Sequence, residues 1–344
     1  MALTDIWFLL IAVLWTGYFV LEGFDFGVGM LLPAVSEDDT DRRVAINTIG
    51  PLWDGNEVWL LVAGGATFAA FPEWYASLFS GFYLPLLIVL VALIVRGVAF
   101  EFRGKIDSVR WRRNWDRAIV FGSLVPALLW GVAFANIIRG VPLDAEHEYT
   151  GTLLTLLNPY ALLGGLATLL LFALHGAVFL ALKTEGRVRE RAVDLARRGG
   201  LAVVLVGGAF LVWTQLAYGA GWTIVSVLAA AAALLGALWL VNRRDGWAFA
   251  LTAAAIIAVT VTLFGSLYPD VLPSSTDPTN SLNTTNAAST PYTLTIMTWV
   301  AVVFTPIVLA YQAWTFWVFR RRVTASQIPP STGLPARVPA GKSR

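Results

Sequence analysis

The stretch GPLWDGNEVWLLVAGG, residues 50–65, combines charged side chains with the beginning of a membrane span. It holds two carboxylates, Asp54 and Glu57, and one amide, Asn56, at the start of an apolar run that continues to Phe71. A charge in hydrocarbon is costly unless it is paired or hydrated, so ionisable residues inside spans are functional candidates. Asp54 and Glu57 are three residues apart and share one face of a helix. We expect the rest of the chain to determine what this face contacts.

The composition is that of a polytopic membrane protein. Of the 344 residues, 57% are hydrophobic and only 13% are charged, whereas a soluble domain carries about 25% charged residues. Cysteine is absent, which excludes disulfides, iron–sulfur clusters and thiol chemistry. The first apolar run lacks a basic leader and a small-residue cleavage site, so we expect a retained helix and not a signal peptide. We expect no nucleic-acid partner.

A spanning helix needs about 20 mostly apolar residues. This rule predicts nine transmembrane helices in an all-α membrane protein, arranged as two four-helix bundles plus one additional helix. The predicted spans are 6–32, 52–72, 75–102, 117–139, 157–182, 200–219, 222–241, 247–268 and 292–319. We expect residues 1–322 to form a single transmembrane domain. Residues 323–344 are rich in proline and are predicted to be a disordered cytoplasmic tail.

The distribution of Lys and Arg predicts the orientation of the chain. Nearly all of the 24 basic residues fall within 42–43, 103–117, 183–198 and 243–244, or after residue 319. The alternate loops hold only Arg139. Since cytoplasmic loops are enriched in Lys and Arg, we expect the N-terminus outside and the C-terminus in the cytoplasm. The loop 268–290 is then external, and we expect it to lie over neighbouring parts of the protein.

Several charged residues are predicted to lie at one depth in the membrane. With a rise of about 1.5 Å per helical residue, Glu22 and Asp25 fall in the inner half of the first helix. Asp54 and Glu57 open the second helix at a similar depth, and Arg96 comes near the inner end of the third. We expect these five residues to form a hydrated acidic pocket, open to the cytoplasm, with Arg96 as counter-charge. Such groups relay protons into membranes.

Two simpler interpretations remain open for these charges. Each side chain could reach the inner headgroups by itself, although the short stems of Asp and Glu make this harder than for Lys or Arg. Alternatively, the charges could serve only to pair neighbouring helices. His175 lies in the inner half of the fifth helix and is the candidate for metal or haem ligation inside the membrane, together with two methionines. A single intramembrane histidine is more often a hydrogen-bonded packing residue.

Several motifs resemble subunit II of the cytochrome bd quinol oxidases. They are GFDFGVGM at 23–30, DRRVAINTIGPLWDGNEVWL at 41–60, AGGATFAAFPEWYASLFSGFY at 63–83, WDRAIVFGSLVPALLWGVAFAN at 115–136, LPSST at 272–276 and TIMTWVAVVFTPIVLAY at 295–311. The resemblance runs from the first predicted helix to the ninth, and WDGNEVW and GFDFGVGM are specific to this family. The segment 183–250 diverges from the family pattern.

The resemblance implies a bacterial respiratory terminal oxidase in the plasma membrane. Such an oxidase has two large subunits of similar fold, often with small single-helix accessory peptides, in contact with membrane lipid and quinone. Subunit I would carry two b-type haems, haem d and the site where quinol is oxidised. Electrons from quinol reduce O2 to water, and protons drawn from the cytoplasm contribute to the proton motive force. Subunit II is not thought to supply haem ligands, which agrees with the scarcity of histidine.

The same resemblance assigns roles to particular residues. The aspartate of WDGN, Asp54, matches a position on the proton pathway of the family, and Asp25 and Arg96 match the GFD aspartate and the arginine of the third helix. Glu57 occupies a position that varies between Gln and Glu. We therefore predict a haem-free subunit that supports subunit I and delivers protons through Asp54, Asp25, Glu57, Arg96 and Glu22. The alternative from another class is a proton-coupled secondary transporter.

Overall fold

The structure is a computed structural model that describes residues 2–330 and 333–335. Its helices are α1 Leu3–Val35, α2 Asp39–Ile49, α3 Trp53–Ala70, α4 Pro72–Gly81, α5 Tyr83–Phe102, α6 Val109–Arg139, α7 Pro159–Lys183, α8 Gly186–Ala217, α9 Ile224–Leu240, α10 Asp245–Leu267 and α11 Pro291–Val318. Short 3-10 turns are η1 Leu153–Leu156, η2 Gly221–Thr223, η3 Pro278–Asn280 and η4 Ala325–Gln327, and short strands are β1 Ile106–Asp107, β2 Asp270–Leu272, β3 Leu282–Asn283 and β4 Leu334–Pro335. The predicted all-α membrane fold is confirmed.

Eight of the helices in the described residues are long and apolar enough to cross a membrane. They are α1, α5, α6, α7, α8, η2 with α9, α10 and α11. The remaining predicted span, 52–72, corresponds to α3. This helix has 18 residues, and its first two turns hold the polar residues Asp54, Asn56 and Glu57. These polar side chains lower the apolar character of a helix that is already short for a bilayer. The count of nine spans therefore stays a prediction.

The predicted span 75–102 is wrong as a single helix, because the helical conformation is interrupted at Phe82, between α4 and α5. Pro85 follows three residues later and has no N–H with which to continue the hydrogen-bond ladder of α4. Phe71, which precedes Pro72, separates α3 from α4 with non-helical φ and ψ of −135° and 71°. A residue before proline is displaced from the helical region. Three shorter helices thus replace the two predicted ones.

Two other helices begin earlier than hydropathy predicts. The span predicted from residue 117 begins at Val109, and the span predicted from residue 200 begins at Gly186. Both added segments are rich in arginine, so a rule based on apolar length does not include them. Contacts with other parts of the fold stabilise these polar N-terminal turns, which lie outside the apolar section of α6 and α8.

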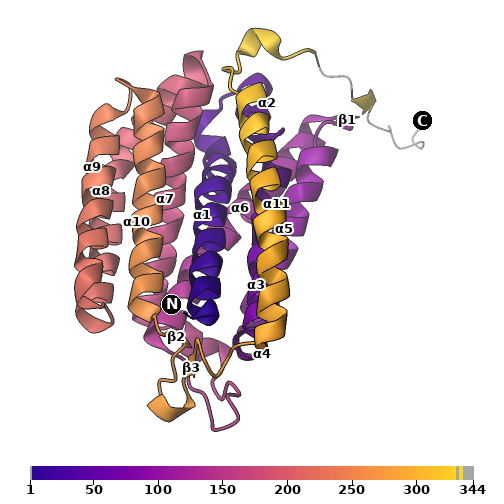
Figure 1. The fold of residues 1–344 in the computed structure, drawn as a ribbon. Coiled ribbons are helices and arrows are strands. Elements are labelled where there is room, and N and C mark those ends of the chain that lie inside the picture. The colour runs from indigo at the N-terminus through magenta and orange to yellow at the C-terminus, as the bar shows by residue number, and fades with distance from the viewer. Residues whose placement is uncertain (1, 331–332, 336–344) are drawn as a thin grey trace, which may run out of the picture.

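The helices pack in two groups around α1 (Figure 1). On one side α3 packs against α1 and is followed by α4, while α5 packs against α6, which also contacts α1. On the other side α7, α8, α9 and α10 pack against each other, with α7 and α10 in contact with α1. α11 lies on the outside of the bundle and touches α1 and α3. This arrangement confirms the two groups plus one additional helix.

The bundle has two chemically different ends. At the upper end in Figure 1 lie α2, β1 and the arginine-rich turns, and we call this the basic end. At the opposite end, the loop end, lie the N-terminal residues, β2 and β3. There β2 pairs antiparallel with β3, and Val141 N–H donates to Pro273 O at 3.0 Å. The expected packing of loop 268–290 over its neighbours is therefore seen. The predicted orientation would place the basic end in the cytoplasm.

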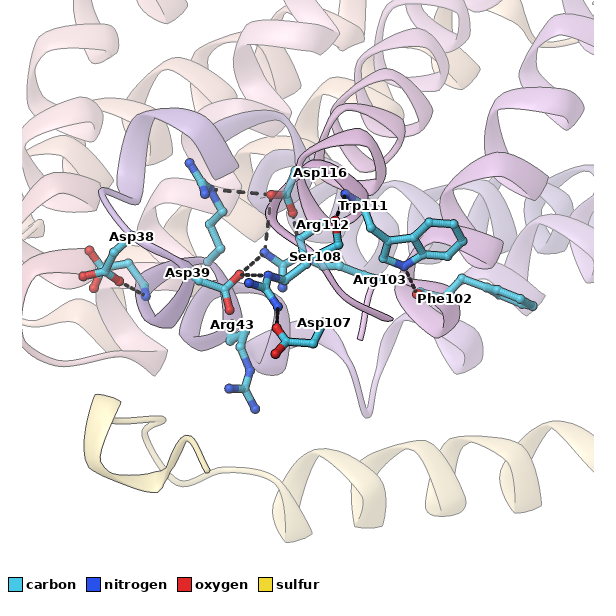
Figure 2. Close-up of polar contacts among 12 residues, drawn as sticks. Asp38, Asp39, Arg43, Phe102, Arg103, Asp107, Ser108, Trp111, Arg112 and Asp116 are labelled. Carbon is cyan, nitrogen blue, oxygen red and sulfur yellow. Dashed lines mark hydrogen bonds and ion pairs between the residues drawn. The ribbon is translucent and has the colours of Figure 1, made fainter. Parts of the chain in front are cut away.

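A network of ion pairs joins α2, the start of α6 and the turn after α5 at the basic end (Figure 2). Arg103 is buried, and its guanidinium donates to Asp116 at 2.5 Å and to Asp39 at 2.8 Å. Arg112 contacts Asp39 at 3.5 Å and Asp107 at 2.8 Å. A buried arginine needs such partners, since an unpaired charge is costly to desolvate. The network fixes α2 across this end of the bundle.

The described part of the C-terminal segment lies against the basic end. Val323 N–H donates to Lys183 O at 2.8 Å, and Arg43 donates to Pro329 O at 2.6 Å. β4 pairs in parallel with β1. Residues 323–330 and 333–335 thus have defined contacts, in contrast to the predicted disordered tail. The rest of that prediction, at 331–332 and 336–344, lies outside the described residues.

Candidate functional site

Four of the five predicted site residues come together in one buried cluster. Glu22 and Asp25 lie on α1, Glu57 on α3 and Arg96 on α5. Residues three or four apart share one face of a helix, which explains why Glu22 and Asp25 point the same way. Asn56 of α3 lies beside them and is fully buried. We call Glu22, Asp25, Asn56, Glu57 and Arg96 the buried charge cluster.

Arg96 connects the carboxylates of two different helices. Its side chain is fully buried, donates to Glu22, and lies 3.3 Å from Glu57 Oε2. The guanidinium carbon lies 4.7 Å from the centre of the Phe26 ring, which adds a cation–π contact. Gly122 of α6 makes room for α5, because a Cβ there would lie 2.5 Å from Arg96 Cβ. The arginine is therefore held between α1, α3 and α6.

Asp25 is bound by an amide and not by the arginine. Asn56 Nδ2 donates to Asp25 Oδ2 at 2.7 Å, and its own Oδ1 accepts from Gln312 Nε2 at 3.0 Å. Gln312 belongs to α11, so this chain of bonds runs through three helices. Neither amide was among the sequence-predicted site residues. Their signal in the sequence is weak, because a neutral amide in a span costs far less than a charge.

Four polar atoms of the cluster lack a partner among the described residues. They are Glu22 Oε2, Asp25 Oδ1, Arg96 Nε and Arg96 Nη1. Buried polar atoms are usually hydrogen-bonded to protein or to ordered water. Two acceptors and two donors of this kind in one place make the site suitable for bridging water molecules.

Asp54, the principal residue of the sequence prediction, lies outside this cluster. Its side chain is exposed, in the first turn of α3, and it forms no ion pair with a described residue. At 100° per residue, Asp54 lies about 160° around the helix from Asn56, with Glu57 between them. The Glu57 side chain is 23% exposed, so the cluster opens to the surface of the chain at Glu57. Asp54 is thus not part of the buried charge cluster, and its place on a proton pathway stays a prediction.

A structural reason for an acid at position 54 also exists. The N-terminus of a helix carries a partial positive charge, and an aspartate in the first turn stabilises it. Asp54 occupies such a position in α3. The negative charge of Asp54 nevertheless lies close enough to repel the carboxylate of Glu57, which is about one helical turn further along α3.

His175 is packed and hydrogen-bonded on both ring nitrogens. Nδ1 lies 2.7 Å from Thr252 Oγ1, and Nε2 lies 3.1 Å from Val20 O. The carbonyl of Val20 can only accept, so Nε2 carries a hydrogen and donates it to this carbonyl. The ring also stacks on Phe249 with centroids 4.7 Å apart. A metal or haem iron at His175 would have to displace one of these bonds, so the residue does not fit a ligand role.

No other group in the described residues is arranged as a metal site. A search for three or more neighbouring His, Cys, Asp or Glu side chains that could hold an ion finds none there. The buried charge cluster itself contains a guanidinium, which would repel a cation.

A separate apolar cavity lies toward the loop end. Its volume is 490 Å³, and its walls come from α1, α3, α4, α5 and α6. The aromatic residues in these walls include Trp15, Trp74, Trp130 and Phe134. Trp74 Nε1 is buried without a described partner. No charged residue lines this cavity, so it is distinct from the buried charge cluster.

Comparisons with known proteins identify the family. The model of the family "Cytochrome bd terminal oxidase subunit II" matches residues 3–319. The chain is 42% identical to cytochrome bd ubiquinol oxidase subunit 2 of Bacillus subtilis over 329 residues, which is 94% of this chain and 97% of that protein. It is 38% identical to cytochrome bd-I ubiquinol oxidase subunit 2 of Escherichia coli K12 in an alignment of 369 positions, gaps included, that covers 95% of this chain and 97% of that protein.

A solved structure shows the same fold. A chain of the bd oxidase from Geobacillus thermodenitrificans superposes with a TM-score of 0.76 at 18% identity. The match covers 93% of this chain and 99% of the other. With the family match, the apolar helices indicate a multi-pass protein of the bacterial plasma membrane. The chain therefore belongs to the cytochrome bd terminal oxidase subunit II family and is a subunit of a respiratory oxidase.

Proposed function

We propose that this chain is the haem-free subunit II of a quinol-oxidising bd oxidase, which supports subunit I and delivers protons to it. The relatives are named ubiquinol oxidase subunits, and the proposal extends quinol oxidation coupled to O2 reduction to the complex of this chain. In this proposal subunit I carries the two b haems, haem d and the quinol site, and small accessory peptides complete the complex. The observation that carries the proposal is the buried charge cluster.

The cluster has the parts of a proton relay. Glu57 is partly exposed and can exchange protons with water, whereas Glu22 and Asp25 are fully buried. Arg96 bridges Glu57 and Glu22, so its positive charge stabilises a carboxylate on either side of it. The net charge of the cluster changes when one carboxyl takes up a proton. A buried group that can change its charge in this way is rare unless it is functional.

Water would complete the connections that side chains alone do not make. The unpartnered atoms of Glu22, Asp25 and Arg96 supply both donors and acceptors. Waters bound to them would join Asp25 to the Arg96 pair, since a bridging water is nearly as favourable as a direct hydrogen bond. Protons could then pass from Glu57 to Asp25 without a moving backbone.

Asp54 has a different place in the proposal than in the sequence prediction. It lies on an exposed face of α3, and α11, of which only Leu294 is buried, exposes an apolar surface as well. In a complex this apolar face is the natural surface for another membrane subunit. We propose that Asp54 acts at the rim of the cluster, where it attracts protons toward Glu57 or passes them to the partner chain.

The cofactor part of the proposal rests on the residues of this chain. His175 has its ring nitrogens engaged, so haem is proposed to lie on subunit I. The apolar cavity near Trp74 fits the predicted contact with membrane lipid or with a quinone tail, since its walls are aromatic and aliphatic. Organic extraction of the purified complex, before and after Gly65→Trp is introduced into the cavity wall, tests this second point.

Turnover of the purified complex tests the proton role. In Asp25→Asn and Glu57→Gln, each side chain keeps its shape but can no longer titrate, and O2 consumption is expected to fall at least 10-fold. Asp54→Asn is expected to have a smaller effect than Asp25→Asn. The haem absorption spectrum reports assembly and should stay unchanged. Unchanged turnover in both Asp25→Asn and Glu57→Gln would remove the cluster from the pathway.

Two rival functions make different predictions. A purely structural role for the charges predicts that Asp25→Asn lowers the yield of the assembled complex but not the turnover of each assembled molecule. A proton-coupled secondary transporter predicts discontinuous helices in matching repeats. The family match gives that alternative no support, and α11 is one continuous helix although it contains Pro306.

A further inference from the structure

α11 is attached to the bundle by polar contacts more than by burial. Only 6% of its most apolar stretch is buried, the lowest share among the candidate spans. Near the loop end, Trp7 Nε1 donates to Leu294 O at 3.2 Å. Beyond the other end of α11, Lys183 Nζ donates to Arg321 O at 2.9 Å. Between these two attachments, Gln312 reaches Asn56 of the buried charge cluster.

The bonds of Asn56 require one orientation of its side-chain amide. Asn56 Nδ2 faces Asp25 Oδ2 at 2.7 Å and Leu21 O at 3.4 Å, and both of these oxygens accept. A carbonyl such as Leu21 O has no hydrogen to donate, so the amide nitrogen must face α1. Asn56 Oδ1 then faces α11, where Gln312 Nε2 donates to it at 3.0 Å. With the amide reversed, its oxygen would face two acceptors.

We propose that Gln312 is a positioning residue that holds the Asn56 amide with its NH2 group toward the Asp25 carboxylate. Through this bond, the packing of α11 against α3 affects the hydrogen bond that Asp25 accepts from Asn56. The consequence for turnover rests on the proposed function, whereas the orientation of Asn56 does not. Gln312 is neutral and does not touch Asp25, so it acts through Asn56 alone.

The other groups that face Asp25 are independent of Gln312. Charges on Glu22 of α1, Glu57 of α3 and Arg96 of α5 act on Asp25. His175 of α7 has its own bonds to Thr252 and Val20. From α11 only the neutral Gln312 reaches the cluster. Replacing Gln312 therefore changes one hydrogen bond and leaves these charges in place.

The experiment is an infrared titration of Asp25 in the assembled complex, with Asp25→Asn used to identify its carboxyl band. Gln312→Met keeps the length of the side chain and removes its donor. Without that donor the amide can turn away, and Asp25 loses a hydrogen bond that stabilises its charged form. The pH midpoint of the band is expected to rise by about one pH unit. Gln312→Glu presents an acceptor to Asn56 Oδ1 and should raise the midpoint further.

A double-mutant cycle distinguishes positioning from a general disturbance of α11. In an Asn56→Ala background, Gln312→Met should produce no further rise, because the group through which Gln312 acts is gone. Thr315→Val is the matched control, since the Thr315 hydroxyl donates to Tyr311 O of its own helix. It should leave the midpoint unchanged.

The outcomes separate this inference from the proposed function. An equal rise from Gln312→Met with and without Asn56, or no rise in either Gln312 variant, would overturn the positioning role. A rise that vanishes without Asn56 supports it even if Asp25→Asn leaves turnover unchanged, in which case only the proton-delivery role fails. If Gln312→Met does not assemble, Gln312→Leu provides the same comparison, since it also removes the donor without adding a charge.

Discussion

At the scale of single residues, Arg96 determines whether the buried charge cluster can exist. It is fully buried and balances Glu22 and Glu57. Breaking a buried ion pair by removing one partner costs about 3–5 kcal/mol, because a charge stays buried without compensation. The arginine thus supports both the packing of α5 and the proposed chemistry.

We therefore expect Arg96→Met to lower the yield of the assembled complex strongly, measured by haem absorbance per amount of this chain in the membrane. Arg113→Met is the control, because Arg113 is an exposed arginine of α6. That variant should assemble normally. Equal losses in the two variants would show that the Arg96 ion pairs do not matter for stability.

The sequence predicts the charged members of the cluster but not its amides. Charges in a span stand out, and helix depth brings Glu22, Asp25, Glu57 and Arg96 to one level. The depth of a residue does not determine how its helix is rotated about its own axis. For this reason depth alone predicts Asp54 in the pocket, whereas the side chain of Asp54 lies on the exposed face of α3. Gln312 could not be predicted, since no pattern in the sequence indicates that α11 packs against α3.

At the scale of helices, close approach of α1 and α7 depends on glycine. A Cβ on Gly27 would lie 2.1 Å from Phe172 O and 2.7 Å from Gly176 Cα. Such contacts between backbones need small residues at the interface. Gly23 and Gly29 of α1 are packing residues as well, since a Cβ at each would meet a neighbour closer than 3 Å.

Gly27→Ala is expected to destabilise the chain by roughly 1–3 kcal/mol, because an added methyl group forces packed backbones apart. Thermal unfolding of the purified complex measures this loss. Gly207→Ala in α8 is a matched control in another membrane helix, since a Cβ there meets nothing within 4 Å. A similar loss in both variants would contradict the interpretation.

The helix α2 depends on its N-terminal cap. Asp38 accepts a hydrogen bond from Asp41 N–H at 2.9 Å, and this bond lowers the pKa of the Asp38 carboxyl. A group with a lowered pKa in the folded state stabilises it above the unfolded value of about 3.9, and the contribution disappears as the pH falls through the folded pKa.

Asp38→Ala should therefore destabilise α2 at pH 7 by about 1 kcal/mol. The difference should shrink as the pH falls from about 4 through the lower pKa of Asp38 in the folded state, where its carboxyl becomes protonated. Protection of α2 amides against hydrogen exchange measures this locally. Asp38→Asn retains an acceptor and should show little loss at either pH. A loss in Asp38→Ala that does not depend on pH would contradict the role of the carboxylate.

The length of each apolar stretch predicts that a helix is present. The residues at which the helix begins and ends depend on contacts and on proline positions, which hydropathy does not describe. The polar first turns of α6 and α8 are held by contacts at the basic end, and α4 and α5 are separated through Pro85. The ion pairs of Arg103 with Asp39 and Asp116 join segments far apart in the sequence. Such contacts exist only after folding, so they could not be read from local pattern.

At the scale of the whole molecule, the chain is a two-ended membrane subunit. The arginine-rich turns gather at one end, and the buried charge cluster lies in the adjacent half of α1, α3 and α5. The family match shows that it works within a cytochrome bd terminal oxidase. In the proposed function the cluster takes up protons from the basic end, which the predicted orientation places in the cytoplasm.

The most direct measurement is the rate of proton uptake from the side of the basic end, in liposomes that contain the complete oxidase. The account predicts that Asp25→Asn slows this uptake at least 10-fold during O2 reduction while the haem spectrum is unchanged. It also predicts uptake from the side of the arginine-rich turns. Uptake at the original rate in Asp25→Asn, or uptake from the loop end, would contradict it.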